Sequence, residues 1–176
     1  MIKGVGAFVL GVLAVCASPL ALAQAKEQSV LQSIAINAPA ETVWAIAGDF
    51  VGLDKWYPLI ESSKRILGRN NEVGCIRELT RLNGTKVEEK LIDYNPWDRT
   101  LTYTYAGGQP LSSDYFATLT VKDTGGGASS VEWKARFKRL DYWVDDPAGD
   151  EKMVKLLTGA YQKGLENLKK LAEAAR

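Results

Sequence analysis

The chain has 176 residues, with 22 Lys and Arg against 21 Asp and Glu and a formal net charge of +1. This balance excludes the strongly basic face that nucleic-acid binding requires, so no nucleic-acid partner is expected. Histidine is absent, which excludes Ser-His-Asp and Cys-His catalysis and removes the commonest zinc ligand. We therefore assign no catalytic residue and expect no metal and no cofactor.

The first 23 residues have the composition of a secretory signal. Lys3 gives a positive start, residues 5–17 are apolar, and Ala21-Leu22-Ala23 supplies the small residues that signal peptidase reads. The apolar run is shorter than the ~20 residues that cross a bilayer, so a retained anchor is the weaker alternative. A lipoprotein is a second alternative, because Cys16 lies at the end of the run. We expect a signal peptide over residues 1–23 and export to the periplasm or the cell exterior.

The remaining residues, 24–176, have the length of one domain. Removing 23 of 176 residues leaves 153, which is enough for a single substantial core. Cys75 is then the only cysteine, so no internal disulfide is expected. We expect this mature domain not to span a membrane.

The first predicted elements are a strand and two short helices. The strand covers Ser29–Asn37, where apolar and smaller residues alternate, and Pro39 ends it. Ala40–Ala47 has the apolar spacing of a short helix, and glycines interrupt the pattern after it. Leu53–Tyr57 favours a second short helix that ends before Pro58.

Six strands follow, separated by turn residues. They are predicted over Glu61–Leu67, Cys75–Leu82, Lys86–Tyr94, Thr100–Ala106, Tyr115–Lys122 and Ser130–Leu140. Asn83-Gly84 between two such runs is typical of a hairpin. Apolar Val131, Trp133 and Phe137 alternate with charged residues, which indicates a sheet buried on one face and therefore antiparallel.

The chain ends in a long amphipathic helix, predicted over Asp150–Ala174 with Asp150 as its N-cap. Apolar residues from Met153 to Leu171 form a stripe at helical spacing. A curved antiparallel sheet of seven strands wrapped around this helix would bury every apolar face, so the predicted fold class is α+β.

Several segments carry a resemblance to a known family. They are Ala38-Pro39-Ala40-Glu41-Thr42-Val43-Trp44, Trp56-Tyr57-Pro58, Val73-Gly74-Cys75-Ile76-Arg77, Glu89-Lys90-Leu91, Asp114-Tyr115 and the helical region Asp145–Leu171. With the order of the elements, they resemble the START-like superfamily, also called SRPBCC, which has the helix-grip fold. Within it, the chain is most similar to the polyketide cyclase/dehydrase and lipid-transfer family, which includes plant abscisic acid receptors. The resemblance covers essentially the whole mature chain.

The resemblance implies a cavity between the concave face of the sheet and the last helix. The matching positions, expected to bind the ligand, are Glu61, Arg77, Leu79, Arg81, Glu89, Tyr103, Tyr105, Tyr115, Leu156, Ala160 and Gly164. The plant receptors place a lysine for the hormone carboxylate where this chain has Glu61, and Asn83-Gly84-Thr85 replaces their Ser-Gly-Leu-Pro gate. These departures argue against abscisic acid as the ligand.

The residues alone leave the role of these positions open. The strand tyrosines fit either a pocket wall or a core with one wet end. Gly159 and Gly164, inside the helix, fit either space for a ligand or close helix–sheet packing. The charged positions fit either a few polar groups in an apolar site or a solvated strand edge.

We expect an exported binding or carrier protein for an apolar small molecule such as a lipid, an isoprenoid or a polyketide-like aromatic. Ala160 and Gly164 are expected to open the space for it. One alternative is a cyclase/dehydratase-like enzyme that uses Glu, Arg and Tyr for acid–base chemistry. Another is a protein-interaction module, whose partner the sequence does not identify.

Overall fold

The computed structural model of the protein describes residues 26–140 and 149–175. Its elements are β1 Glu27–Ile36, α1 Ala40–Ala47, the 3-10 helix η1 Leu53–Lys55, β2 Ile60–Leu67, β3 Ile76–Arg81, β4 Lys86–Asn95, β5 Thr100–Gly108, β6 Ser113–Gly125, β7 Ala128–Lys138 and α2 Gly149–Ala174. This order confirms the predicted helix-grip fold of the α+β class. The expected signal peptide lies outside the described residues.

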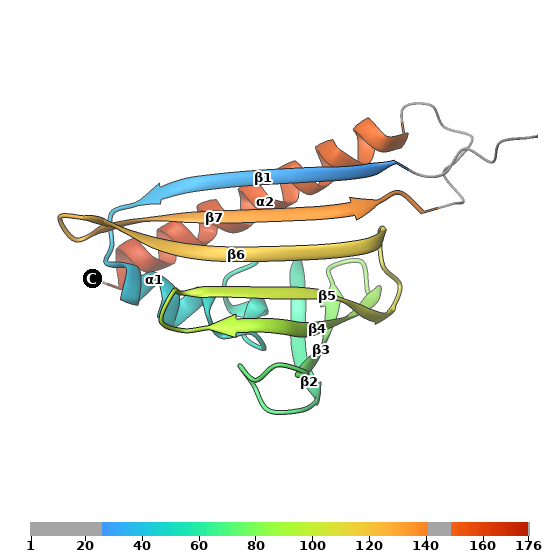
Figure 1. Ribbon diagram of the computed structural model, residues 1–176, viewed down its shortest axis with the longest axis horizontal. Helices are drawn as coiled ribbons and strands as arrows, with labels where there is room; N and C mark the ends of the chain where they lie inside the picture. Colours follow the sequence, from blue (N-terminus) through green and yellow to red (C-terminus); the bar gives the residue numbers. More distant parts are fainter. Residues whose placement is uncertain (1–25, 141–148, 176) are drawn as a thin grey trace, which may run out of the picture.

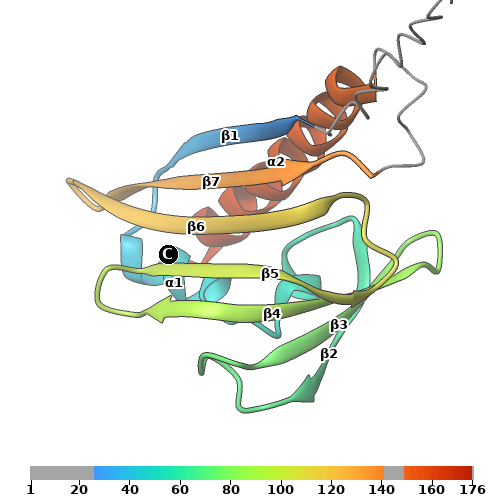
Figure 2. The same cartoon turned by 45° about the vertical axis from the view of Figure 1, so that its right-hand side comes forward.

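The seven strands form one curved antiparallel sheet in the order β1-β7-β6-β5-β4-β3-β2. Strand β1 lies at one edge of the sheet and pairs with β7, from Glu27 opposite Lys138 to Ile36 opposite Ser129. Helix α2 runs along the inner side of the sheet behind β1 and β7, as Figures 1 and 2 show. The core therefore lies between the sheet and α2.

The strands are buried on one face only, as their alternation predicted. On β7, Val131, Trp133 and Phe137 are buried. On the outer face, threonine hydroxyls pair across neighbouring strands, with Oγ1 atoms 2.9 Å apart for Thr100 and Thr120. The outer face is thus polar, and the apolar side chains are left to meet α2.

Helix α2 packs its apolar stripe on the sheet. The buried residues that recur at helical spacing are Met153, Leu157, Tyr161, Gly164, Leu165, Leu168 and Ala172. The helix begins at Gly149, so the prediction of Asp150 as its N-cap is wrong, and Asp150 lies in the first turn. Its carboxylate accepts a hydrogen bond from Nε2 of Gln28 on β1 at 3.3 Å.

Side chains of the β2–β3 turn hold the loop that follows α1. The backbone N–H of Phe50 donates to Oδ1 of Asn71 at 2.9 Å, and that of Val51 donates to Oδ1 of Asn70 at 3.1 Å. Asn71 has a φ of 62°, in the left-handed region that asparagine tolerates better than most residues. The loop thereby seats Phe50, which is fully buried, against the inner face of the sheet.

Two features are absent from residues 26–140 and 149–175. In these ranges no helix is both long and apolar enough to cross a membrane. The same residues include no group of three or more Cys, Asp and Glu side chains arranged to hold a metal ion.

Candidate functional site

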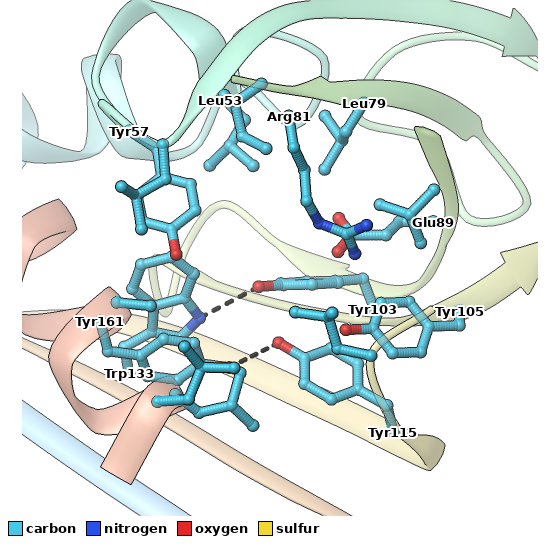
Figure 3. A pocket seen from close by; sticks show the side chains of 17 residues that line it. Leu53, Tyr57, Leu79, Arg81, Glu89, Tyr103, Tyr105, Tyr115, Trp133 and Tyr161 are labelled. Carbon is cyan, nitrogen blue, oxygen red and sulfur yellow. Dashed lines mark hydrogen bonds between the residues drawn. The ribbon is translucent and has the colours of Figure 1, made fainter. Parts of the chain in front are cut away.

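A cavity of about 140 Å³ lies between the inner face of the sheet and α2. It is lined by Leu53, Tyr57, Leu59, Ile60, Leu79, Arg81, Val87, Glu89, Tyr103, Tyr105, Leu111, Tyr115, Trp133, Leu156, Leu157, Ala160 and Tyr161. Figure 3 shows phenols and an indole forming one wall, with Arg81 and Glu89 reaching in from β3 and β4. The lining is therefore mostly apolar, with a few convergent polar groups, as in small-molecule sites generally.

Aromatic contacts fix the wall of the cavity that joins the sheet to α2. The Trp133 indole on β7 stacks on the Tyr161 ring on α2, with centroids 4.1 Å apart and planes 9° apart. Trp133 Nε1 also donates to the Tyr103 hydroxyl at 3.1 Å. On the neighbouring strands, Tyr105 stacks on Tyr115 with centroids 4.3 Å apart. Because these rings pack on one another, the wall is preformed and does not depend on a ligand for its shape.

The phenols of this wall are held in their neutral form. Burial raises the pKa of Tyr103 and Tyr105, and the nearby Glu89 carboxylate raises both further. Burial likewise raises the pKa of Tyr115 and Tyr161 well above 10. The four hydroxyls thus act as hydrogen-bond donors and acceptors without charge at physiological pH.

Glu89 is held by a buried arginine on the adjacent strand. Arg77 donates from Nε and NH2 to Oε2 of Glu89, at 2.9 and 2.6 Å, and from NH1 to the carbonyl oxygen of Phe50. Its guanidinium lies over the Phe50 ring, 4.1 Å from the centroid. Both partners are almost fully buried, so each offsets the desolvation of the other. Within the described ranges, Oε1 of Glu89 has no hydrogen-bond donor.

Arg81 lies at the rim, where two turns of the sheet meet. Its NH1 donates to the carbonyl oxygen of Gln109 in the β5–β6 turn at 2.9 Å and to Oγ1 of Thr85 in the β3–β4 turn at 3.2 Å. The Gln109 N–H also donates to the Lys86 carbonyl oxygen at 2.7 Å. These bonds connect the two turns beside the cavity.

Most of the expected site residues surround one cavity. Those that line it are Leu79, Arg81, Glu89, Tyr103, Tyr105, Tyr115, Leu156 and Ala160. Arg77 lies behind this lining and acts on it through Glu89. Whether these residues bind a ligand stays a prediction.

The expectation that Glu61 faces the cavity is wrong. Glu61 is exposed and lies outside the lining. The reason is an irregularity in the pairing of β2 with β3, where Ile60 lies opposite Arg81 and the next paired residue is Ser62, opposite Thr80. Ile60 takes the inward position, and Glu61 is left on the outside.

The expectation that Gly164 opens space for a ligand is also wrong. A Cβ at this position would lie 2.7 Å from Cδ2 of Tyr57 and 3.0 Å from Cζ3 of Trp133. Gly164 therefore permits close packing of α2 against these rings. Gly159 differs, because a Cβ there would meet nothing within 4 Å.

Three of the aromatic residues that line the cavity are not marked as site residues by any pattern in the sequence. They are Tyr57, Trp133 and Tyr161. The alternation of β7 and the apolar stripe of α2 placed Trp133 and Tyr161 inward, but these signals are the same for a core residue and for a cavity wall. Tyr57 follows η1 in a loop, where no periodicity gives its direction.

Comparisons with known proteins agree with this architecture. A family model described as polyketide cyclase / dehydrase and lipid transport matches residues 27–173. The abscisic acid receptor PYL6 of Arabidopsis thaliana is 26% identical over 144 residues, which cover 78% of this chain and 66% of the receptor, just under two thirds of its length.

Solved structures show the same fold. Protein XoxI from Bacillus cereus has a TM-score of 0.71 at 29% identity, over 81% of this chain and 93% of that one. Norcoclaurine synthase from Thalictrum flavum, in complex with dopamine and hydroxybenzaldehyde, has a TM-score of 0.65 at 18% identity, over 97% and 98%, and supports the fold alone. The family match spans nearly all of the described residues, and the chain therefore belongs to the polyketide cyclase/dehydrase and lipid transport family.

Proposed function

We propose that the protein is an exported binding or carrier protein for a small, mostly apolar molecule held between the sheet and α2. The observation that carries the proposal is the cavity, whose wall of supporting aromatic rings encloses only a few polar groups. Similarity to an abscisic acid receptor supports it. A packed core would give these rings no common free volume.

The size of the cavity favours a compact ligand. Its volume of about 140 Å³ is below the ~300–1,000 Å³ of ordinary ligand pockets, and a dry apolar cavity of about 150 Å³ holds benzene. One aromatic ring or a short chain therefore fits the structure as it stands. A longer lipid would require the rim, where Leu156 is 51% exposed, to move outward.

An enzyme that moves a proton is the second candidate. The supporting observation is Glu89, whose Oε2 is fixed by Arg77 while Oε1 has no donor among the described residues. Such a carboxylate beside neutral phenols has the groups that general acid–base catalysis uses. The Glu89→Gln variant distinguishes the two functions, because a carrier loses affinity or selectivity, whereas a general base loses turnover and retains binding.

The proposal is tested with a neutral probe and a variant that fills the cavity. We expect n-propylbenzene to shift the NMR signals of the residues that line the cavity. The Ala160→Phe variant should abolish this effect, because Ala160 lines the cavity, whereas Lys163→Phe on the exposed side of α2 should not. Circular dichroism checks that both variants are folded.

Native mass spectrometry of freshly purified protein, followed by solvent extraction, identifies any ligand that co-purifies. If nothing co-purifies and n-propylbenzene leaves the lining residues unchanged, the cavity is not a binding site and the proposal fails.

A further inference from the structure

The charges around the cavity do not cancel. Three charged groups meet there, namely the guanidinium groups of Arg77 and Arg81 and the carboxylate of Glu89. Arg77 and Glu89 form a buried ion pair, so together they are neutral. Arg81 remains, and the site carries one positive charge in excess.

The described surroundings of Arg81 contain no anion that pairs with it. Among residues 26–140 and 149–175, no carboxylate lies within ion-pair distance of the Arg81 guanidinium. Its hydrogen-bond acceptors at the rim, the Thr85 hydroxyl and the Gln109 carbonyl, are neutral groups. Glu61, next to the β2 residue opposite Arg81, is exposed and lies outside the lining.

The charge of Arg81 reaches the interior of the cavity. It opposes the effects of burial and of Glu89 on the pKa of both Tyr57 and Tyr105, which line the same space. The bonds to the two turns hold the guanidinium at the rim, so it does not have to be ordered when a ligand binds. A planar guanidinium in a partly desolvated place is well suited to a carboxylate.

We propose that the ligand is an acidic amphiphile, whose carboxylate pairs with Arg81 at the rim while its apolar body lies among the aromatic rings. This inference rests on the proposed binding function and adds the chemical class of the ligand.

Three probes with one apolar body and different head groups test this assignment. They are 3-phenylpropanoate, 3-phenylpropan-1-ol and 3-phenylpropan-1-ammonium, titrated calorimetrically into the purified protein at pH 7. We expect the carboxylate to bind about tenfold more tightly than the alcohol, which is about 1.4 kcal/mol, and the ammonium to bind most weakly. Equal affinities of the alcohol and the carboxylate would overturn the assignment.

Variants then locate the cation. Arg81→Gln should abolish the preference for the carboxylate while the alcohol still binds, and Arg81→Lys should keep part of the preference. Arg136→Gln is the matched control, since Arg136 pairs with Glu27 and half of its side chain is exposed. A preference that survives in Arg81→Gln would show that another group recognises the anion.

The outcomes separate this inference from the proposed function. If n-propylbenzene and the alcohol bind but the carboxylate is not preferred, the acidic class is wrong and the binding function stands. The class is equally wrong if n-propylbenzene binds and none of the three probes does. If n-propylbenzene and all three probes fail to bind and no ligand co-purifies, both proposals fall together.

Discussion

The phenol oxygens of Tyr115 and Tyr161 lie 2.5 Å apart and join β6 to α2 in the lining of the cavity. Both side chains are buried. Each of the two rings also stacks on another aromatic ring: Tyr115 on Tyr105, and Tyr161 on Trp133. The contact thus connects the β6 and α2 parts of the aromatic wall of the candidate site.

Removing one hydroxyl of this pair should cost more than removing both. The Tyr161→Phe variant leaves the Tyr115 hydroxyl buried without this partner, and we expect the free energy of unfolding to fall by about 1–3 kcal/mol. The double variant Tyr115→Phe/Tyr161→Phe leaves no orphaned group and should be more stable than the single variant. Urea denaturation of the three proteins measures this, and additive losses would contradict the prediction.

The buried phenols should make the protein unstable at high pH. The pKa values of Tyr103, Tyr105, Tyr115 and Tyr161 are raised in the folded state above 10, the value of an exposed phenol. Above pH 10 the unfolded chain therefore loses protons that the folded chain keeps, and stability falls as the pH rises further. Below pH 10 these groups contribute no pH dependence.

Phenolate absorbance, followed together with circular dichroism, checks this. We expect these four tyrosines to ionise only as the fold is lost, in one cooperative step. Ionisation of all the tyrosines near pH 10 with an unchanged fold would mean that the cavity wall is open to water.

The sequence was sufficient for the fold because its signals are local. Alternation on β7 and the apolar stripe of α2 each required burial on one side, and only a few arrangements of such elements satisfy that requirement. The site was predictable where a residue follows this alternation, as Tyr103 and Tyr105 on β5 do.

The site was not predictable where it depends on an irregularity or on a distant side chain. Glu61 is turned outward by the shift in register between β2 and β3, which no pattern in the sequence marks. The space beside Gly164 is filled by the ring of Tyr57. Tyr57 lies more than a hundred positions earlier, in a loop whose conformation is not periodic. A glycine in a helix does not say whether a ligand, a side chain or open space lies beside it, as the difference between Gly164 and Gly159 shows.

The two glycines of α2 provide a matched pair of substitutions. Alanine gains about 0.5–1 kcal/mol of helix stability over glycine, and this gain is common to both positions. At Gly159 the new Cβ meets nothing within 4 Å, so Gly159→Ala should be stabilising. At Gly164 it approaches the Tyr57 ring at 2.7 Å, and we expect Gly164→Ala to be less stable than Gly159→Ala by about 1–3 kcal/mol. Thermal unfolding of both variants measures the difference, and equal stabilities would show that Tyr57 moves aside freely.

Export is tested on the protein made in its own cells. The signal pattern over residues 1–23 predicts a mature chain that begins near Gln24 and is found outside the cytoplasm. N-terminal sequencing of the protein from the extracytoplasmic fraction gives the answer directly. A retained Met1 would refute cleavage, and a lipid on Cys16 would establish the lipoprotein alternative.

The buried pair of Arg77 and Glu89 allows a sharper test of what holds the site together. Replacing Arg77 by Met leaves the Glu89 carboxylate buried without its cation, and we expect a loss of about 3–5 kcal/mol in the free energy of unfolding. The double variant Arg77→Met/Glu89→Leu removes both charges and should recover most of this loss, because the desolvation of two ions is no longer required.

The comparison of these variants also separates stability from recognition. In the double variant Arg81 keeps its bonds to Thr85 and Gln109, so the rim cation is still in place. We therefore expect the double variant to fold and to bind the probes more weakly, because Glu89 lines the cavity, but still to bind 3-phenylpropanoate more tightly than 3-phenylpropan-1-ol. Urea denaturation and calorimetry on the same samples measure the two quantities. A double variant that folds but has lost this preference would show that the buried pair, and not Arg81 alone, recognises the ligand's charge.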